Sequence, residues 1–187
     1  MMKIVGFMGS PRKNGNTAVL LQQVMEGAKK EGAECTVHYL NDLKIRGCQG
    51  CNACKSKGYC VIPDDMQNIY QTINEADVLV FSSPVYMWEM TAQLKLVVDR
   101  LYAYLNADYS SRLAKPIKFA LLFTQHRAVE DAFMPYFESV AGILKVIGFE
   151  FVPEILVGSG LHDAGEVKSN DALMEKAYKL GRKLSLK

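Results

Sequence analysis

Four of the five cysteines lie close together, within residues 48–60. Cys48, Cys51, Cys54 and Cys60 follow a C-x2-C-x2-C-x5-C spacing. Such short spacings return the chain to one small volume, so four thiolates can surround a single iron–sulfur cluster. The first candidate chemistry is therefore redox chemistry at a cluster of the 4Fe–4S type, bound by these four residues.

Two other interpretations of the same cysteines stay open. Nearby positive charge favours the thiolate form and would make the thiols reactive; the basic residues are Lys44, Arg46, Lys55 and Lys57. Cysteine also packs as a small apolar residue, so the segment can be structural. A zinc ribbon is disfavoured, because one compact run lacks two separated ligand pairs.

Apolar runs and helical patterns alternate along the chain, which is typical of an α/β fold. Strands are predicted at residues 3–8, 35–40, 78–81, 117–123 and 151–157, and helices at 18–28, from a cap at Asp64 or Asp65 to about 74, at 91–104, before 147 and after 170. Parallel neighbours need crossover connections, so we expect a three-layer sandwich around a five-stranded parallel sheet of order 2-1-3-4-5. The cysteine-rich segment, at about 44–64, is an excursion from this domain.

Composition limits the partners and the number of domains. The 187 residues carry 22 basic and 20 acidic side chains, well mixed, so neither nucleic acid nor an anionic membrane is an expected partner. Neither a secretory signal nor a membrane-spanning apolar run is apparent, and clustered thiols favour a reducing compartment. We expect one cytoplasmic domain over residues 1–187, acting on small molecules.

The loop after the first strand offers donors for a phosphate. It has neither a G-x-G-x-x-G nor a G-x-x-x-x-G-K-S/T motif, so dinucleotide and P-loop folds are disfavoured. Its hydroxyls and amides can instead bind a terminal phosphate at the start of the first helix; these residues are Ser10, Asn14, Asn16 and Thr17, with Arg12 or Lys13 adding charge. The alternative is a plain loop in which Asn16 or Thr17 caps the helix.

Three segments, in this order, resemble a known family. They are G-S-P-R-K-N-G-N-T at 9–17, the cysteine segment ending in G-Y-C-V-I-P-D-D-M at 58–66, and S-P-V-Y at 83–86 with T-A-Q-L-K at 91–95 and D-R at 99–100. Over about residues 1–125 the chain resembles the flavodoxin-like NAD(P)H-dependent FMN reductases and iron–sulfur flavoproteins. The resemblance implies a flavodoxin-like fold with FMN as cofactor and NAD(P)H as co-substrate.

The resemblance also implies where the flavin lies. It assigns the first loop to the FMN phosphate and a second loop to the isoalloxazine ring, namely Pro84, Val85, Tyr86, Met87 and Trp88, with Thr124 near the flavin. A flavin needs a flat slot, backbone donors and aromatic surface, which the second loop can supply. Alternatively, Tyr86 and Trp88 are core or interface residues.

The loop after Thr124 departs from the family pattern. Where the family often places glycine after the threonine, this chain continues Gln125-His126-Arg127. His126 would narrow the site and Arg127 would stabilise negative charge on a reduced flavin. We favour the alternative that both are solvated loop residues, because a lone histidine or arginine on a loop is rarely catalytic.

These inferences predict a function and two rivals. We expect an FMN-dependent oxidoreductase that passes electrons from NAD(P)H to a flavin, quinone, nitro compound or metal ion, with no catalytic residue beyond the flavin-binding ones. The rivals are an iron–sulfur electron carrier served by ferredoxin and a flavodoxin-like binding or scaffold protein.

The resemblance further implies a homodimer or homotetramer that completes the flavin pocket from a neighbouring subunit. We expect one apolar helix to pack against its counterpart in that subunit; its contact residues would be Leu96, Val97, Leu101, Tyr102 and Tyr104.

Overall fold

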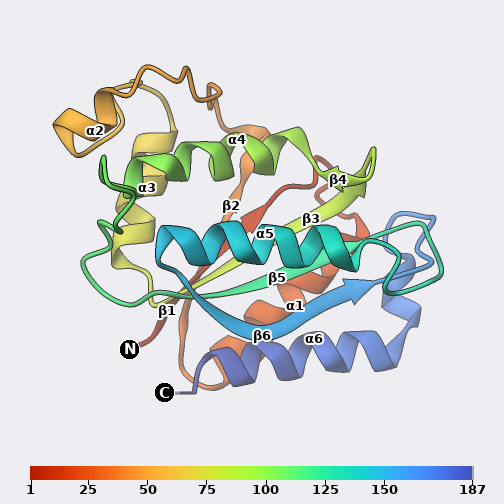
Figure 1. The fold of residues 1–187 in the computed structure, drawn as a ribbon. Coiled ribbons are helices and arrows are strands. Elements are labelled where there is room, and N and C mark those ends of the chain that lie inside the picture. Colours follow the sequence, from red (N-terminus) through yellow and green to blue (C-terminus); the bar gives the residue numbers. More distant parts are fainter. Residues whose placement is uncertain (187) are drawn as a thin grey trace.

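The computed structural model describes residues 1–186, which build an α/β sandwich around a parallel sheet (Figure 1). The strands are β1 (Lys3–Met8), β2 (Glu34–Tyr39), β3 (Val78–Tyr86), β4 (Glu89–Met90), β5 (Lys118–Thr124) and β6 (Glu150–Gly158). The order β2-β1-β3-β5-β6 is the predicted one, and the two-residue β4 pairs antiparallel with β3 outside this path. The predicted doubly wound, flavodoxin-like topology is confirmed, with β4 as an additional strand.

Helices cover both faces of the sheet. They are α1 (Asn16–Lys30), α2 (Ala53–Lys57), α3 (Met66–Glu75), α4 (Ala92–Arg100), α5 (Met134–Ile147) and α6 (Asp171–Leu184), with 3-10 turns η1 (Leu40–Asp42), η2 (Leu101–Tyr104) and η3 (Glu166–Ser169). Helices α1 and α6 share one core with one face of the sheet, while α3, α4 and α5 share the other. No helix within residues 1–186 is long and apolar enough to cross a membrane.

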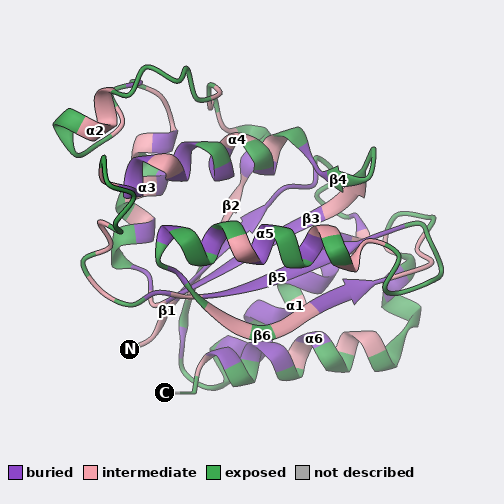
Figure 2. Ribbon diagram, viewed as in Figure 1, coloured by how far each residue is buried: buried purple, intermediate pink, exposed green. Residues whose placement is uncertain are grey.

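Side chains alternate between the two cores along each central strand, as the two-residue period of a strand requires. In β3, Leu79 and Phe81 enter the α3–α4–α5 core, whereas Val78 and Val80 enter the α1–α6 core. The central strands are therefore buried on both sides (Figure 2). Such double burial explains why they read as continuous apolar runs in the sequence.

Helix α4 and the following turn η2 do not expose the face predicted for a subunit contact. Val97, Leu101 and Tyr104 are buried in the core of this chain. The prediction that these three residues meet a second copy is therefore wrong, because the same apolar spacing serves the sheet. Leu96 and Tyr102 remain partly exposed.

Two glycines allow α1 and α6 to touch along their backbones. A Cβ at Gly181 would overlap the carbonyl of Val24, and a Cβ at Gly27 would overlap the carbonyl of Tyr178. Neither neighbour is a flexible side chain that could move aside. This contact holds the C-terminal helix against the helix that follows the first loop.

We predict that Gly181→Ala lowers the free energy of unfolding by about 2 kcal/mol or more, as overpacking of a rigid contact does. The matched control is Gly142→Ala in α5, where nothing lies within 4 Å of the new Cβ. That change should raise stability by up to about 1 kcal/mol, because alanine favours a helix. Urea unfolding followed by circular dichroism measures both, and equal effects would contradict the backbone contact.

Candidate functional site

The first loop and the third strand are joined at the carboxyl edge of the sheet. The Gly9 N–H donates to the carbonyl of Ser82 at 2.8 Å, and the Thr91 hydroxyl donates to the carbonyl of Gly9 at 2.8 Å. The Thr91 N–H in turn donates to the Ser83 hydroxyl at 2.9 Å. A Cβ at position 9 would come within 2.9 Å of the Ser82 carbonyl and the Thr91 hydroxyl, so glycine is needed for this close approach. The two loops thus lie side by side at the carboxyl edge of the sheet, where the strand order predicts a ligand crevice.

The start of α1 has the features of an anion site. Gly15, before the helix, supplies no side-chain cap, and the first turn contains no acidic residue. The free N–H groups and the dipole of a helix N-terminus attract negative charge. Ser10 and Thr17 are buried at this end, whereas Arg12 and Asn14 are exposed.

Thr17 and Thr124 meet at the base of the first loop. Their hydroxyl oxygens are 2.6 Å apart and buried, although the residues are 107 positions apart in the sequence. This contact brings the end of β5 to the first turn of α1. Both residues are candidates from the sequence, and the fold makes them neighbours.

The Asn16 side chain is hydrogen-bonded to the segment that precedes α6. Its amide nitrogen donates to the carbonyl of Asp163 at 2.8 Å, and its oxygen accepts the N–H of Val167 at 3.1 Å. Lys13 pairs with Asp42 at 2.6 Å. The Asn16 and Lys13 side chains are therefore engaged within the chain, and the backbone N–H groups of the first turn of α1 remain as candidates for binding an anion.

A strained hairpin follows β3. The predicted strand ends at residue 81, but β3 continues to Tyr86 and turns back into β4. Met87 and Trp88 at the turn have φ of 45° and 70°, the left-handed region that favours glycine. They are 83% and 63% exposed. Consecutive non-glycine residues in this conformation carry strain of the kind found at functional sites.

Two histidines that the sequence leaves unpartnered come together beyond β5 and β6. The rings of His126 and His162 are 3.8 Å apart between centroids, in a T-shaped arrangement. Gln125, just before His126, is buried and donates to the carbonyl of Val129 at 2.6 Å. Both histidines are exposed, so His126 lies on a solvated loop as predicted, but no local pattern in the sequence signals its contact with His162.

The cysteines are unequally exposed and are not gathered into a metal site. Cys48 and Cys51 are exposed, while Cys54 and Cys60 are partly buried, and all are free thiols. In residues 1–186 no three His, Cys, Asp or Glu side chains are grouped as metal ligands. As folded here, the segment therefore does not fit a cluster.

A buried ion pair closes the cysteine segment. The Arg100 guanidinium donates to both carboxylate oxygens of Asp64, at 2.8 and 3.2 Å, and the two side chains are 1% and 6% exposed. Burial alone would raise the pKa of Asp64, but hydrogen bonds from Arg100 and from the Arg46 N–H outweigh it and lower that pKa. Asp64 is thus held as a carboxylate.

The sheet order and the helices on both faces define a flavodoxin-like fold. The chain is similar over its whole length to an NAD(P)H:quinone oxidoreductase from Methanothermobacter marburgensis, with a TM-score of 0.80, 19% identity and 98% of that chain covered. It is also similar to an archaeal flavodoxin, with a TM-score of 0.62, 12% identity and coverage of 99% of this chain and 96% of that one.

The sequence then gives the family. The profile of the NADPH-dependent FMN reductases matches residues 2–145, and the chain belongs to that family. It is 41% identical over 99 residues to an iron–sulfur flavoprotein of Methanocaldococcus jannaschii, covering 53% of this chain and 51% of that protein. One from Methanosarcina thermophila is 39% identical over 53% of this chain and 52% of its own length. The matched region spans about half of these curated relatives.

We predict that Asp64→Asn lowers the free energy of unfolding at neutral pH by about 3 kcal/mol, because it strands a buried guanidinium. The folded pKa of Asp64 is lowered, so its contribution is present above the unfolded value of about 4 and is lost as the pH falls through the folded value. The difference in free energy of unfolding between wild type and Asp64→Asn should therefore become smaller below about pH 4. Urea unfolding at several pH values measures it, with the exposed Asp131→Asn as control; a difference that persists in acid would contradict the pairing.

Proposed function

We propose that the protein is an FMN-dependent oxidoreductase that takes electrons from NAD(P)H and passes them to a small acceptor such as a flavin, quinone, nitro compound or metal ion. The observation that carries this proposal is the junction of the two loops, in which Gly9 is hydrogen-bonded to Ser82 and Thr91. It places the uncapped start of α1 and the buried hydroxyls of Ser10 and Thr17 at the same edge of the sheet as the exposed hairpin that follows β3. Family membership supports FMN and NADPH as the molecules that use it.

The residues fit the two ends of FMN. The helix N-terminus and the Ser10 and Thr17 hydroxyls suit a dianionic phosphate, and Thr124 supports Thr17 through their 2.6 Å contact. The exposed hairpin side chains supply apolar surface for a ring. Bound FMN supplies the hydride acceptor and the electron donor. The chain's own contribution is to hold the phosphate and ring and to leave one face open to NAD(P)H and the acceptor.

A second candidate is an iron–sulfur electron carrier that feeds the flavin and exchanges electrons with ferredoxin. The curated relatives named iron–sulfur flavoprotein and the four clustered cysteines favour it. Cys48, Cys51, Cys54 and Cys60 would be the ligands after a rearrangement of the segment. Iron and acid-labile sulfide in anaerobically purified protein distinguish this carrier from a reductase that uses flavin alone. The clustered cysteines favour a reducing compartment, and we place the protein in the cytoplasm.

We further propose a homodimer, formed through the groove between α4 and α5. The groove has a volume of about 540 Å³ and is lined mainly by apolar side chains, including Val98, Tyr102, Tyr136 and Val140. Ile143 and Val146 in α5 are 53% and 64% exposed beside it. The groove reaches Glu89 and Met90 of the hairpin, so a second copy seated here would lie next to the flavin crevice.

We predict that NADPH bleaches the flavin of the FMN-loaded protein under anaerobic conditions and that a quinone restores its colour. Thr17→Ala should weaken FMN binding by about 1.5–3 kcal/mol, the contribution of a hydrogen bond to a charged group. Riboflavin, which lacks the phosphate, should bind the variant as it binds wild type. Flavin fluorescence titrations and stopped-flow absorbance measure these effects.

The control for this experiment is Thr72→Ala in α3, whose hydroxyl donates to the Asn68 carbonyl outside the crevice. It should leave both affinities unchanged. If Thr17→Ala lost equal affinity for FMN and for riboflavin, the assignment of Thr17 to the phosphate would be contradicted. Tight FMN binding without reduction by NADPH or NADH would favour the electron carrier or a binding protein.

We predict that the wild-type protein is at least a dimer and that Ile143→Glu shifts it to the monomer, because a charge would be buried in an apolar contact. The control is Leu186→Glu, an exposed position after α6 on the opposite face of the sheet. Light scattering measures both variants. A monomeric wild type that retains FMN would show that the pocket needs no neighbour.

A further inference from the structure

The hairpin that turns at Met87 and Trp88 needs support from the rest of the chain. Its ladder is short, because the returning strand β4 has two residues, Glu89 and Met90. A two-stranded hairpin alone is marginally stable at best in water. The left-handed φ of Met87 and Trp88 adds strain, and such strain persists only where the surrounding structure determines the conformation. Contacts from outside the hairpin therefore decide its shape.

Two side-chain hydroxyls bind consecutive backbone N–H groups where the hairpin returns to the core. The Tyr136 hydroxyl accepts the N–H of Met90 at 3.0 Å, and the Ser83 hydroxyl accepts the N–H of Thr91 at 2.9 Å. Ser83 belongs to β3, so its bond closes the hairpin on its own strand. Tyr136 lies in the first turn of α5, 46 positions from Met90 in the sequence, and its bond joins the hairpin to the helix layer (Figure 1).

Aromatic neighbours hold the Tyr136 ring. It lies in edge-on arrangements with Phe123 of β5 and with Phe137, at centroid distances of 6.3 and 6.1 Å. Phe123 and Phe137 are fully buried and stack on each other. A packed aromatic cluster thus presents the Tyr136 hydroxyl to Met90. Burial raises the pKa of the Tyr136 phenol, so the group that accepts this hydrogen bond is neutral at neutral pH.

We propose that Tyr136 is a positioning residue that holds the hairpin in the conformation that receives the isoalloxazine ring. The inference rests on the proposed function, in which the hairpin side chains supply the surface for that ring. The hydrogen bond from Met90 fixes the backbone directly after the strained turn, and the buried Met90 side chain fixes it from the core. The signature of this role is a loss of ring binding, in contrast to the phosphate binding that Thr17 serves.

The first test is flavin binding by Tyr136→Phe, which removes the hydroxyl and keeps the ring. The variant should lose affinity for FMN and for riboflavin by the same factor, about fivefold, because one neutral hydrogen bond is lost behind a surface that both ligands use. Thr17→Ala, by contrast, should lose affinity for FMN alone. Flavin fluorescence titrations measure both ligands in both variants.

Trp88 gives a second measurement that needs no flavin. It is the only tryptophan in the sequence, so selectively excited tryptophan fluorescence of the flavin-free protein reports on the hairpin. Time-resolved anisotropy should show a larger amplitude of fast local motion for Trp88 in Tyr136→Phe than in wild type, because a strained turn that loses its anchor moves more freely. A uniform loss of stability does not produce this change in protein that remains folded.

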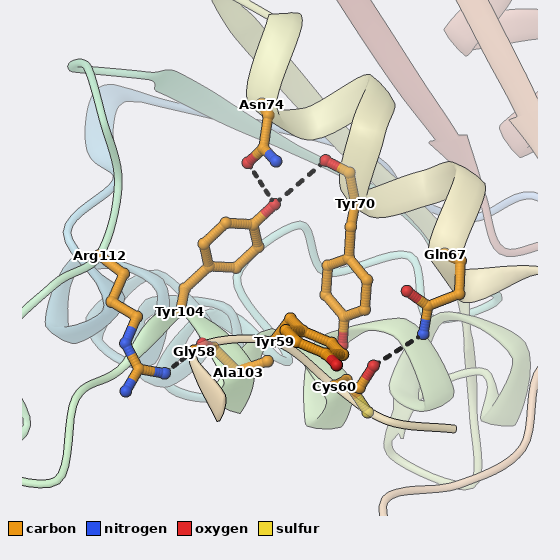
Figure 3. A pocket seen from close by; sticks show the side chains of 9 residues that line it. All are labelled: Gly58, Tyr59, Cys60, Gln67, Tyr70, Asn74, Ala103, Tyr104 and Arg112. Carbon is orange, nitrogen blue, oxygen red and sulfur yellow. Dashed lines mark hydrogen bonds between the residues drawn. The ribbon is translucent and has the colours of Figure 1, made fainter. Parts of the chain in front are cut away.

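The matched control is Tyr104→Phe, which deletes another hydrogen-bonded tyrosine hydroxyl. Tyr104 donates to the Asn74 side chain at 2.9 Å and to the carbonyl of Tyr70 at 3.3 Å, beside a cavity of about 180 Å³ that the cysteine-rich segment helps to line (Figure 3). This variant should lower the free energy of unfolding, measured with urea, as Tyr136→Phe does. Both flavin affinities and the Trp88 anisotropy should stay as in wild type.

Unchanged Trp88 anisotropy in Tyr136→Phe would overturn the proposal, and so would increased motion of Trp88 with wild-type affinity for both flavins. Equal effects of Tyr136→Phe and Tyr104→Phe on Trp88 would mean general loosening and would also overturn it. The proposed function fails separately, if the wild-type protein binds no FMN. Tight FMN binding by wild type with an unaltered Trp88 in Tyr136→Phe would reject the role of Tyr136 alone.

Discussion

The hydrogen bonds among Gly9, Ser82, Ser83 and Thr91 are the contact on which the functional part of the molecule depends. They fix the loop after β1 against the end of β3, and Thr91 also caps α4 by accepting the N–H of Leu94. The same few atoms therefore join the two loops and cap the start of α4. Because a Cβ at Gly9 would press on this contact, the constraint is visible as a glycine in the sequence.

Helix α4 connects the two chemically interesting regions. Its first turn lies at the crevice, and its last residue, Arg100, holds the cysteine segment. Figure 1 shows β4 beyond one end of this helix and α2 beyond the other. The nine residues of α4 span about 13 Å at the normal helical rise, so the regions are separate but rigidly related.

The buried charges show how a loop without regular structure can be held. Arg100 is almost fully buried, which is unfavourable for an ion unless its hydrogen bonds are made. Three hydrogen bonds from its guanidinium serve this purpose, two to Asp64 and one to the Arg46 carbonyl, whereas its Nε has no hydrogen-bond partner among the described residues. The geometry of an arginine fork suits this task better than a point charge does.

The sequence by itself determined the five parallel strands, their order and the two loops at the carboxyl edge, although not β4 or the full length of β3. Hydrophobic patterns are local, and in a parallel sheet the loops that follow the strands lie at one edge. It also indicated the family through three ordered motifs. It did not indicate the contact of Thr17 with Thr124, the packing of His126 on His162 or the use of Asn16 to hold Val167, since these residues are 36 to 151 positions apart in the chain. The role of Arg100 was equally hidden. An apolar helix face that ends in one arginine is typical of a surface helix. In the fold the cysteine segment covers Arg100, and a buried guanidinium needs a partner such as the Asp64 carboxylate.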